Sequence, residues 1–409
     1  MENNNIPSPF PPPLTPPNYG NLADAIPKMQ QQAETVAQAS AMLPSLQSQP
    51  QLSPAQAPVG ASQTPPQRKI TTTQPDDYFT KGIFGKEVRD YQACASRVTG
   101  YKTLDAMQPF YPGFYCIGAI SSLGKTTFCQ QMADQIAAAG FWVLYFSLEQ
   151  SHFELFSKSL ARGFYKTNRA DTRKNNRPST YPTPSSIDIR RGLTSSCPQE
   201  MAAQIDSYIQ ATQNRIYVID GAFSLTVEDI RGIVDDFINL TGESPVVIVD
   251  YLQIIAPSLI NGRVPDTKTS IDHIVHALKV MQTDYNLSAL AISSLNRSNY
   301  TSPVDFESFK ESGGIEYTAD VIWGLQLSVL NSREFYHHYD NNGKQKGETT
   351  MKEKREMINL EKAKSPRSVD LVCLKNRYGI SNYSLPFEYY PASDYFCPPY
   401  NPNNSLTWP

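Results

Sequence analysis

The sequence lacks an apolar run of 18 residues, so we expect no membrane-spanning helix. Its first residues, MENNNIPSPFPPPLTPP, lack a basic start and an apolar stretch, so we also expect no signal peptide. None of the six cysteines forms a CxxC pair, which disfavours a zinc knuckle or a disulfide framework. Cys116 and Cys129 stand among apolar residues. We therefore expect them to be buried free thiols in a reducing cytoplasm.

A strong charge imbalance is also missing. The formal net charge of the 409 residues is -3, so a broad basic surface for nucleic acid is not implied, although a local basic channel remains compatible. No internal repeat is evident, which disfavours a tandem pair of ATPase domains. With 40% hydrophobic residues, the chain is long enough for one large domain or two ordinary ones.

The first part of the chain differs in composition from the rest. Residues 1–75 are dominated by Pro, Gln, Ser and Ala and carry few charges, so we expect a disordered tail. Within it, residues 22–43 have the alternative of forming a short helix in a complex. Residues 76–94 mix aromatic and charged side chains and are expected to form a linker helix that leads into the domain.

From residue 95 to 395, apolar strand-like runs alternate with helical patterns, which predicts an α/β fold. Continuous apolar runs are typical of a buried, mostly parallel sheet flanked by helices. We expect residues 166–186 to form a loop, 331–366 an inserted charged arm with a helix near its end, and 396–409 a C-terminal tail. The predicted strands are 114–119, 141–148, 215–219, 245–249, 288–293, 320–326 and 369–374.

One stretch, FYCIGAISSLGKTTFCQQMADQIAAAG, joins a predicted strand to a predicted helix through a turn of small residues. The pattern is that of a P-loop whose first glycine is replaced by Ala119, in a helix ending near Gly140. Backbone amides and the helix N-terminus would hold the β- and γ-phosphates of ATP, with Lys125 adding a charge and Thr126 a hydroxyl for Mg²⁺. The predicted nucleotide-binding residues are Ser121, Ser122, Leu123, Gly124, Lys125, Thr126 and Thr127.

Two carboxylates follow other predicted strands. Asp250 ends the apolar strand in SPVVIVDYLQII, at the sheet edge where open α/β sheets bind ligands, and is the expected second Mg²⁺-side acid. Glu149 closes VLYFSLE and could polarise the water that attacks the γ-phosphate. By position alone, Glu149 could equally be a solvated residue at the end of a strand.

Several motifs occur in the order seen in DnaB-like replicative helicases, particularly those of phages and mobile elements. They are TGYKTLD, GAISSLGKTTF, YFSLEQS, VVIVDYLQII, SSLNRS, FKESGGIEYTADVIWGL and CLKNRYGI. The resemblance covers roughly residues 80–390 and implies a RecA-like ATPase motor domain. It also implies a homo-hexameric ring with ATP between subunits, single-stranded DNA in the channel and 5′–3′ movement.

The resemblance assigns roles to individual residues. It implies that Glu149 is the catalytic base, that Asp250 is the Mg²⁺-side acid, and that Lys375 and Arg377 reach the γ-phosphate bound by the neighbouring subunit. Cationic donors suit the charge that develops on the phosphoryl group. Without the resemblance, Lys375 and Arg377 would be read as an ordinary basic turn after a strand.

The resemblance also places loops in the central channel. The stretch 256–270 carries Arg263 and Lys268, and SSLNRS carries Arg297; these are candidate contacts to DNA phosphates. A solvated loop is the alternative interpretation of the same residues.

The chain departs from the family pattern in two places. Ser294 stands where the family has a glutamine that senses the γ-phosphate, so coupling between hydrolysis and the DNA loops is in question. The Pro/Gln-rich tail stands where the family has a helical domain that meets primase, which puts the usual primase contact in doubt.

Three hypotheses follow. The first is a DnaB-like DNA helicase that uses ATP and Mg²⁺ during replication, with primase or other replisome proteins as partners. The second is a RecA-like DNA-dependent ATPase that acts in recombination or helicase loading without unwinding. The third is a nucleotide-binding scaffold, which is disfavoured because Lys125, Glu149, Asp250, Lys375 and Arg377 are all present.

Overall fold

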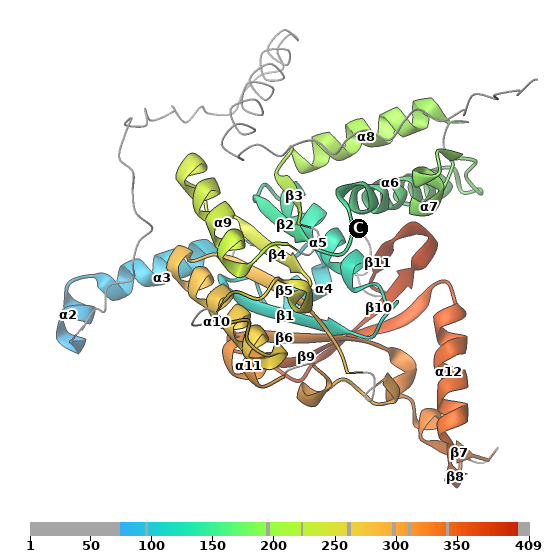
Figure 1. Ribbon diagram of the computed structural model, residues 1–409. Coiled ribbons are helices and arrows are strands. Elements are labelled where there is room, and N and C mark those ends of the chain that lie inside the picture. Colours follow the sequence, from blue (N-terminus) through green and yellow to red (C-terminus); the bar gives the residue numbers. More distant parts are fainter. Residues whose placement is uncertain are drawn as a thin grey trace, which may run out of the picture. The chain divides into compact units, whose positions relative to one another are not determined.

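The computed structural model describes residues 74–94, 97–193, 197–221, 224–259, 263–296, 300–309, 312–340 and 343–399. The predicted disordered tail up to residue 73 and its 22–43 segment lie outside the described residues, as does Arg297. Within the described part, helices and strands alternate along most of the chain (Figure 1).

The helices are α2 (Pro75–Thr80), α3 (Ile83–Cys94), α4 (Lys102–Met107), α5 (Lys125–Ala138), α6 (His152–Asn175), α7 (Ser186–Arg190), α8 (Pro198–Thr212), α9 (Val227–Thr241), α10 (Thr267–Tyr285), α11 (Ser312–Thr318) and α12 (Met351–Ala363). The strands are β1 (Gly113–Ala119), β2 (Val143–Ser147), β3 (Ile216–Asp220), β4 (Val246–Asp250), β5 (Ser288–Ser294), β6 (Val321–Leu327), β7 (His337–Tyr339), β8 (Gln345–Glu348), β9 (Arg367–Asn376), β10 (Ser384–Tyr390) and β11 (Tyr395–Cys397).

The main sheet has nine strands in the order β11-β10-β9-β6-β1-β5-β4-β2-β3. The six strands from β6 to β3 run parallel, and β9, β10 and β11 are added antiparallel. All seven predicted strands are present, and the mostly parallel α/β fold is confirmed. Every residue of β1 and β4 is buried, including Asp250 at the end of β4, as expected for the apolar runs that form these strands.

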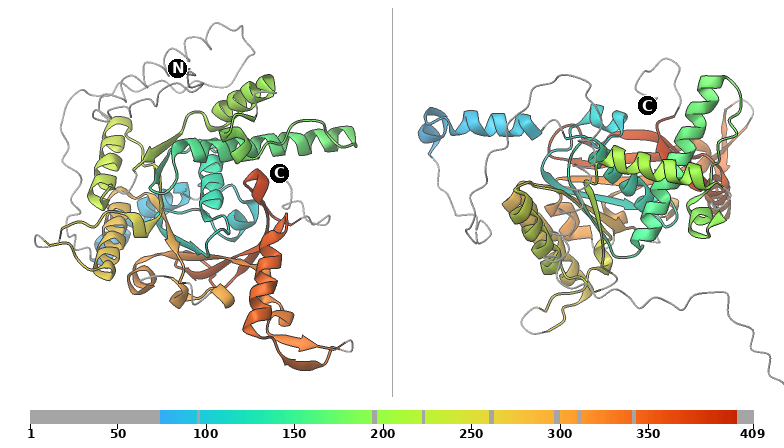
Figure 2. Two further views of the ribbon diagram at one scale, coloured as in Figure 1. Left: turned by 45° about the vertical axis from the view of Figure 1, so that its right-hand side comes forward. Right: turned by 90° about the horizontal axis from the view of Figure 1, so that it is seen from above.

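Helices cover both faces of this sheet for a topological reason. The chain first moves outward from β1 to β2 and β3, and right-handed crossovers place α5, α6 and α8 on one face. It then moves back through β4 and β5 to β6, so the same handedness places α9, α10 and α11 on the other face. Figures 1 and 2 show these two groups of helices apart from one another.

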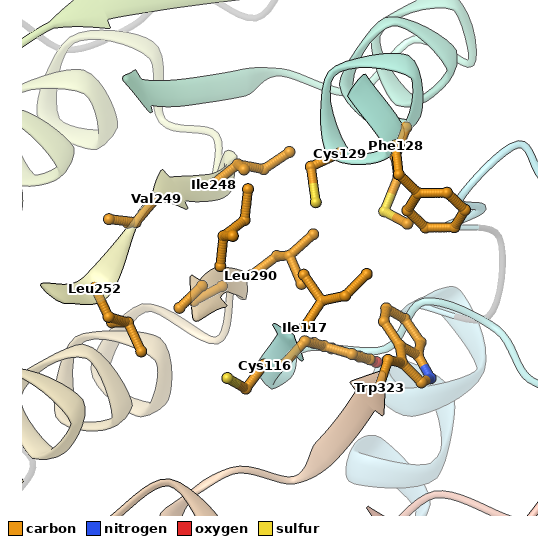
Figure 3. Packing of buried hydrophobic residues seen from close by; sticks show 14 of the residues in the cluster. Cys116, Ile117, Phe128, Cys129, Ile248, Val249, Leu252, Leu290 and Trp323 are labelled. Atoms are coloured by element: carbon orange, nitrogen blue, oxygen red, sulfur yellow. The ribbon is translucent and has the colours of Figure 1, made fainter. Parts of the chain in front are cut away.

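The hydrophobic core lies between the sheet and these helices. Figure 3 shows Ile117 of β1 packed among Phe128 of α5, Leu290 of β5 and Trp323 of β6. Cys116 and Cys129 are buried free thiols, as expected, and burial raises the pKa of both above its ordinary value. They therefore pack as small apolar side chains.

Three expectations about boundaries were wrong or incomplete. The first half of the predicted loop 166–186 is helix, because α6 continues to Asn175; a capping box of Ser151 and Glu154 starts α6, and no proline interrupts it. The linker is two helices, α2 and α3, rather than one. Strand β11 crosses the predicted boundary at residue 395, because Tyr395, Phe396 and Cys397 are buried in the sheet.

The helix expected near the end of the 331–366 segment is present. Residues 351–363 form α12, started by a capping box of Thr350 and Glu353, and the β7–β8 hairpin precedes it. This helix can be predicted from sequence because its capping residues lie close together in the chain. The short polar strands of the hairpin carry no comparable signal.

Candidate functional site at the carboxyl edge of the sheet

The parallel register brings several chain segments to one edge of the sheet. Ala119 of β1 pairs with Ser294 of β5, and Ser147 of β2 pairs with Asp250 of β4. Because parallel strands end at the same edge, the turn after β1, the bend after β2 and the end of β4 meet there. This edge is where open α/β sheets bind ligands.

The turn between β1 and α5 has the backbone shape of a phosphate cradle. Ser122 and Gly124 adopt left-handed conformations with φ of 65° and 88°. A Cβ at Gly124 would lie 2.9 Å from Tyr389 and 3.0 Å from Phe396, so only glycine fits. Gly124 gives α5 no side-chain cap, which leaves the first amides of the helix available to an anion.

Two further contacts hold this turn in place. The Arg367 guanidinium donates a hydrogen bond of 2.9 Å to the Ser122 carbonyl oxygen. The hydroxyls of Ser121 and Tyr300 lie 3.2 Å apart. The turn is therefore fixed from β9 on one side and from the segment after β5 on the other.

Lys125 opens α5 and points along the edge. Its Nζ lies 3.5 Å from the Ser293 carbonyl oxygen and 5.9 Å from the centre of the Tyr251 ring. Burial lowers the pKa of Lys125, and the charges of Asp250 and Glu149 oppose this shift. A phosphate group beside Lys125 would add negative charge and favour the charged ammonium further.

Asp250 is buried, with 1% of its surface exposed. Burial raises its pKa to about 6, although hydrogen bonds with Thr126 and Tyr145 lower it. The Tyr145 hydroxyl donates to Oδ2 over 3.0 Å. Thr126 and Asp250 are therefore side by side, and their role in holding Mg²⁺ stays a prediction.

The donor set at this edge suits Mg²⁺ in one specific way. Across the part of the chain that the structure describes, no cluster of three or more His, Cys, Asp or Glu residues could hold a metal. Mg²⁺ is typically bound by one or two protein oxygens together with waters and substrate phosphates. Thr126 and Asp250 fit that pattern beside a phosphate cradle.

Glu149 lies in the bend after β2, not at the end of the strand as predicted, because β2 stops at Ser147. The carboxylate is exposed. Its charge nevertheless acts on Lys125, Asp250 and Tyr251, which places it at the same edge. An exposed carboxylate here can accept a proton from a water held against the phosphate chain.

Gln253 was missed by the sequence analysis. It follows β4, and its Nε2 donates to the Ser293 hydroxyl over 3.0 Å, while its Oε1 accepts from the Ser294 amide over 3.2 Å. A glutamine side chain thus binds the end of β5, where Ser294 itself carries only a hydroxyl. The signal was available as the Gln of VVIVDYLQII, but its partner lies one strand away.

A second missed group lies behind α5. The Asp394 carboxylate, 3% exposed, accepts from the Thr127 hydroxyl over 3.1 Å and pairs with Lys158 at 2.9 Å. Gln131 clasps the backbone of Phe396, donating to its carbonyl over 2.8 Å and accepting from its amide over 2.9 Å. The β10–β11 hairpin therefore packs against α5 and holds it in place.

Lys375 and Arg377 lie at the opposite edge of the sheet. Arg377 pairs with Asp320 at 3.0 Å, just before β6 begins, and Lys375 donates to the Glu316 carbonyl oxygen over 2.5 Å. The amide of Phe114, near the start of β1, also donates a hydrogen bond to Asp320. Along β1, the five residues from Phe114 to Ala119 span about 16 Å. The structure therefore does not bring this pair to the phosphate cradle of its own chain.

Asp320 holds Arg377 as an ionised carboxylate. Burial alone would raise the pKa of Asp320, but hydrogen bonds from Lys279 and the Phe114 amide, with the charges of Lys279 and Arg377, lower it below its ordinary value. Lys279 lies 2.6 Å away. About half of the Arg377 side chain remains exposed, so it can still be reached from outside the chain.

Two of the three predicted DNA contacts lie within the described residues. Arg263 is exposed, and Lys268 is exposed in the first turn of α10, which Asp266 caps. Lys268 is therefore helical and not part of a loop as expected.

No helix in the described residues is long and apolar enough to cross a membrane.

The central parallel sheet, the glycine-containing turn before α5 and the acid at the end of β4 define a RecA-like P-loop protein. The DnaB-like helicase C-terminal domain model matches residues 98–381, more than half of the chain. The chain therefore belongs to the DnaB-like helicase family, and the resemblance drawn from its motifs is confirmed.

Solved structures agree on the fold. One of them, described as an ATPase domain, has a TM-score of 0.59 and 17% identity, covering 79% of this chain and 99% of that one. A DnaB-like replicative helicase, described with its interactions with primase, has a TM-score of 0.57 and 18% identity, covering 80% of this chain and 67% of that one. No curated protein sequence matches significantly.

Proposed function

We propose that this chain is the ATP-hydrolysing motor of a DnaB-like DNA helicase, which moves 5′–3′ along single-stranded DNA and separates the duplex during replication. Family membership supports a replicative helicase. The carrying observation is that the phosphate cradle and the Arg377 side chain lie at opposite edges of one sheet. A ring of identical subunits can bring one chain's Arg377 to the next chain's cradle, and we propose a hexamer.

In the proposed site, the amides from Ser121 to Thr127 and the Lys125 ammonium bind the phosphates of ATP. Thr126 and Asp250 hold Mg²⁺, which would neutralise phosphate charge. The oxygen of the attacking water bonds to the γ-phosphorus, and the bond from the γ-phosphorus to the β–γ bridging oxygen breaks. Glu149 takes a proton from this water. Lys375 and Arg377 of the neighbouring subunit stabilise the charge that develops on the γ-phosphoryl oxygens.

DNA contact and partners complete the proposal. Exposed Arg263 and Lys268 would contact DNA phosphates, and Arg297 remains a candidate outside the described residues. Replication proteins such as a primase are proposed partners, since one structural neighbour is a DnaB-like helicase described with primase.

One observation favours a second candidate function. Ser294 cannot reach as far as a glutamine, and Gln253 is already engaged with the end of β5. A DNA-dependent ATPase without unwinding would fit weak coupling at this position. A strand-displacement assay separates the two, because only the helicase releases the displaced strand.

The first test is ATP hydrolysis with and without single-stranded DNA, with the mass measured in the same buffer. We expect a hexamer whose turnover DNA stimulates, and a fall of about 10³-fold or more for Arg377→Ala, the usual worth of such an arginine. Lys364→Ala serves as the matched control. It removes an exposed lysine just before β9 begins, whereas Arg377 lies just after β9 ends. Full turnover by a stable monomer would refute the proposal.

A further inference from the structure

Helix α6 carries a row of basic side chains. Between Lys158 and Arg177 the sequence has seven lysines and arginines and one acid, Asp171. The row recurs every three or four residues, which places it along one face of the helix. Its members are Lys158, Arg162, Lys166, Arg169, Arg173 and, just past the helix end, Arg177.

The inner end of this row is neutralised inside the protein. Lys158 pairs with Asp394 at 2.9 Å, and Arg162 pairs with Asp134 at 2.5 Å. Both pairs are largely buried and brace α6 against α5 and the turn between β10 and β11. These two cations are therefore structural, and they fix the direction in which the rest of the row leaves the sheet.

The outer end of the row is more exposed to solvent than the inner end. Lys166, Arg173, Lys174 and Arg177 are exposed. Lys166 lies 5.4 Å over the Tyr395 ring. Figure 2, left, shows α6 extending beyond the strands.

Arg169 is also held by aromatic rings. Its guanidinium lies 5.6 Å over Tyr165 and 5.7 Å over Tyr390. Aromatic rings of this kind hold the stems of cationic side chains while their charge stays near water.

We infer that the outer basic face of α6, Lys166 to Arg177, is a contact surface for the phosphate backbone of single-stranded DNA. Successive charges are about 5–6 Å apart along a single line, which fits one backbone rather than the two of a duplex. Residues 166–180 contain no large apolar side chain, whereas the centre of a protein interface usually does. The chemistry therefore favours a polyanion over a protein partner.

This surface is separate from the proposed ATP site and channel contacts. Helix α6 ends at Asn175, 17 residues beyond Lys158, which contacts Thr127 of α5, so the tip is roughly 26 Å along the helix from the P-loop. Lys268 belongs to α10, on the other face of the sheet. The inference thus adds a second DNA contact and does not depend on ATP hydrolysis.

The test is equilibrium binding of labelled oligothymidylate to the full chain, without nucleotide, over a range of salt concentrations. The variant Arg173→Gln/Lys174→Gln/Arg177→Gln removes three charges at the tip. The control Lys344→Gln/Lys346→Gln/Lys352→Gln removes three exposed charges on the β7–β8 hairpin and α12. Circular dichroism and urea unfolding verify that both variants fold.

We expect the tip variant to bind about tenfold more weakly and its salt slope to fall by about 2, since each single-strand phosphate contact contributes about 0.7. The control should stay within about twofold of the wild type. Equal losses in both variants, or no loss at the tip, would overturn the inference. So would a loss confined to duplex DNA, or a loss of self-association with DNA binding intact.

The two proposals fail separately. Absence of ATP hydrolysis with tip-dependent DNA binding would defeat the proposed function and leave this inference standing. Normal DNA-stimulated hydrolysis and strand separation, with DNA binding indifferent to the tip, would do the reverse.

Discussion

Asp250 carries a carboxylate in a position that water barely reaches. Burial raises its pKa to about 6, against an ordinary value of 3.8, despite the hydroxyls of Thr126 and Tyr145. The position of Asp250 was predictable, because an apolar run ending in an acid is a local pattern. The contacts of Gln253 were not, because they depend on which strand lies beside β4.

The shifted pKa of Asp250 predicts a pH dependence of stability. Between about pH 4 and pH 6 the folded chain keeps a proton that the unfolded chain releases, so the free energy of unfolding falls as pH rises through this window. The full loss is about 3 kcal/mol. The substitution Asp250→Asn removes the titrating carboxyl and with it this loss. Without Mg²⁺ and nucleotide, the variant should therefore gain stability relative to the wild type as pH rises.

Urea unfolding in EDTA at about pH 4.5 and about pH 7.5 measures this difference. Glu149→Gln, which removes a carboxylate from an exposed position, is the matched control. A wild-type minus Asp250→Asn difference that is the same at both pH values would contradict the assignment.

At the scale of elements, the C-terminal hairpin is the least expected part of the site. The strands from β1 to β6 are long apolar runs, and their prediction from sequence succeeded. Strand β10 mixes polar residues with aromatic ones, and β11 has only three residues. Their burial arises from contacts with α5, more than 260 positions away in sequence, such as Gln131 with Phe396, so no local pattern reveals it.

Phe396 should therefore support the P-loop. Its ring is 1% exposed, stacks on Tyr389 at 4.2 Å and meets Phe128 edge-on at 5.3 Å. We expect Phe396→Ala to lower the free energy of unfolding by about 3–5 kcal/mol. Phe396→Leu, which keeps most of the volume, should cost clearly less.

Urea unfolding checks the size of this effect, and the KM for ATP checks its location. Because the stacked rings lie against Gly124, we expect the KM of Phe396→Ala to rise under conditions where the variant is folded. A loss below about 1 kcal/mol for Phe396→Ala would show that the hairpin does not brace the cradle.

At the scale of the whole molecule, the two halves of the proposed catalytic site face away from each other. Lys125 and Asp250 lie where the parallel strands end, and Arg377 lies where β6 begins. From sequence alone, Lys375 and Arg377 would be an ordinary basic turn, and only the family resemblance assigned them a role. The proposed role between subunits is consistent with the structure, because Arg377 does not reach the cradle of its own chain.

The measurement that tests this most directly is ATP hydrolysis by mixtures of two inactive variants, Lys125→Ala and Arg377→Ala, in the presence of single-stranded DNA. A mixed ring contains interfaces that join an intact cradle to an intact Arg377, so we predict activity that neither variant has alone. Mixtures that form oligomers of the wild-type mass but hydrolyse no ATP would contradict catalysis between subunits.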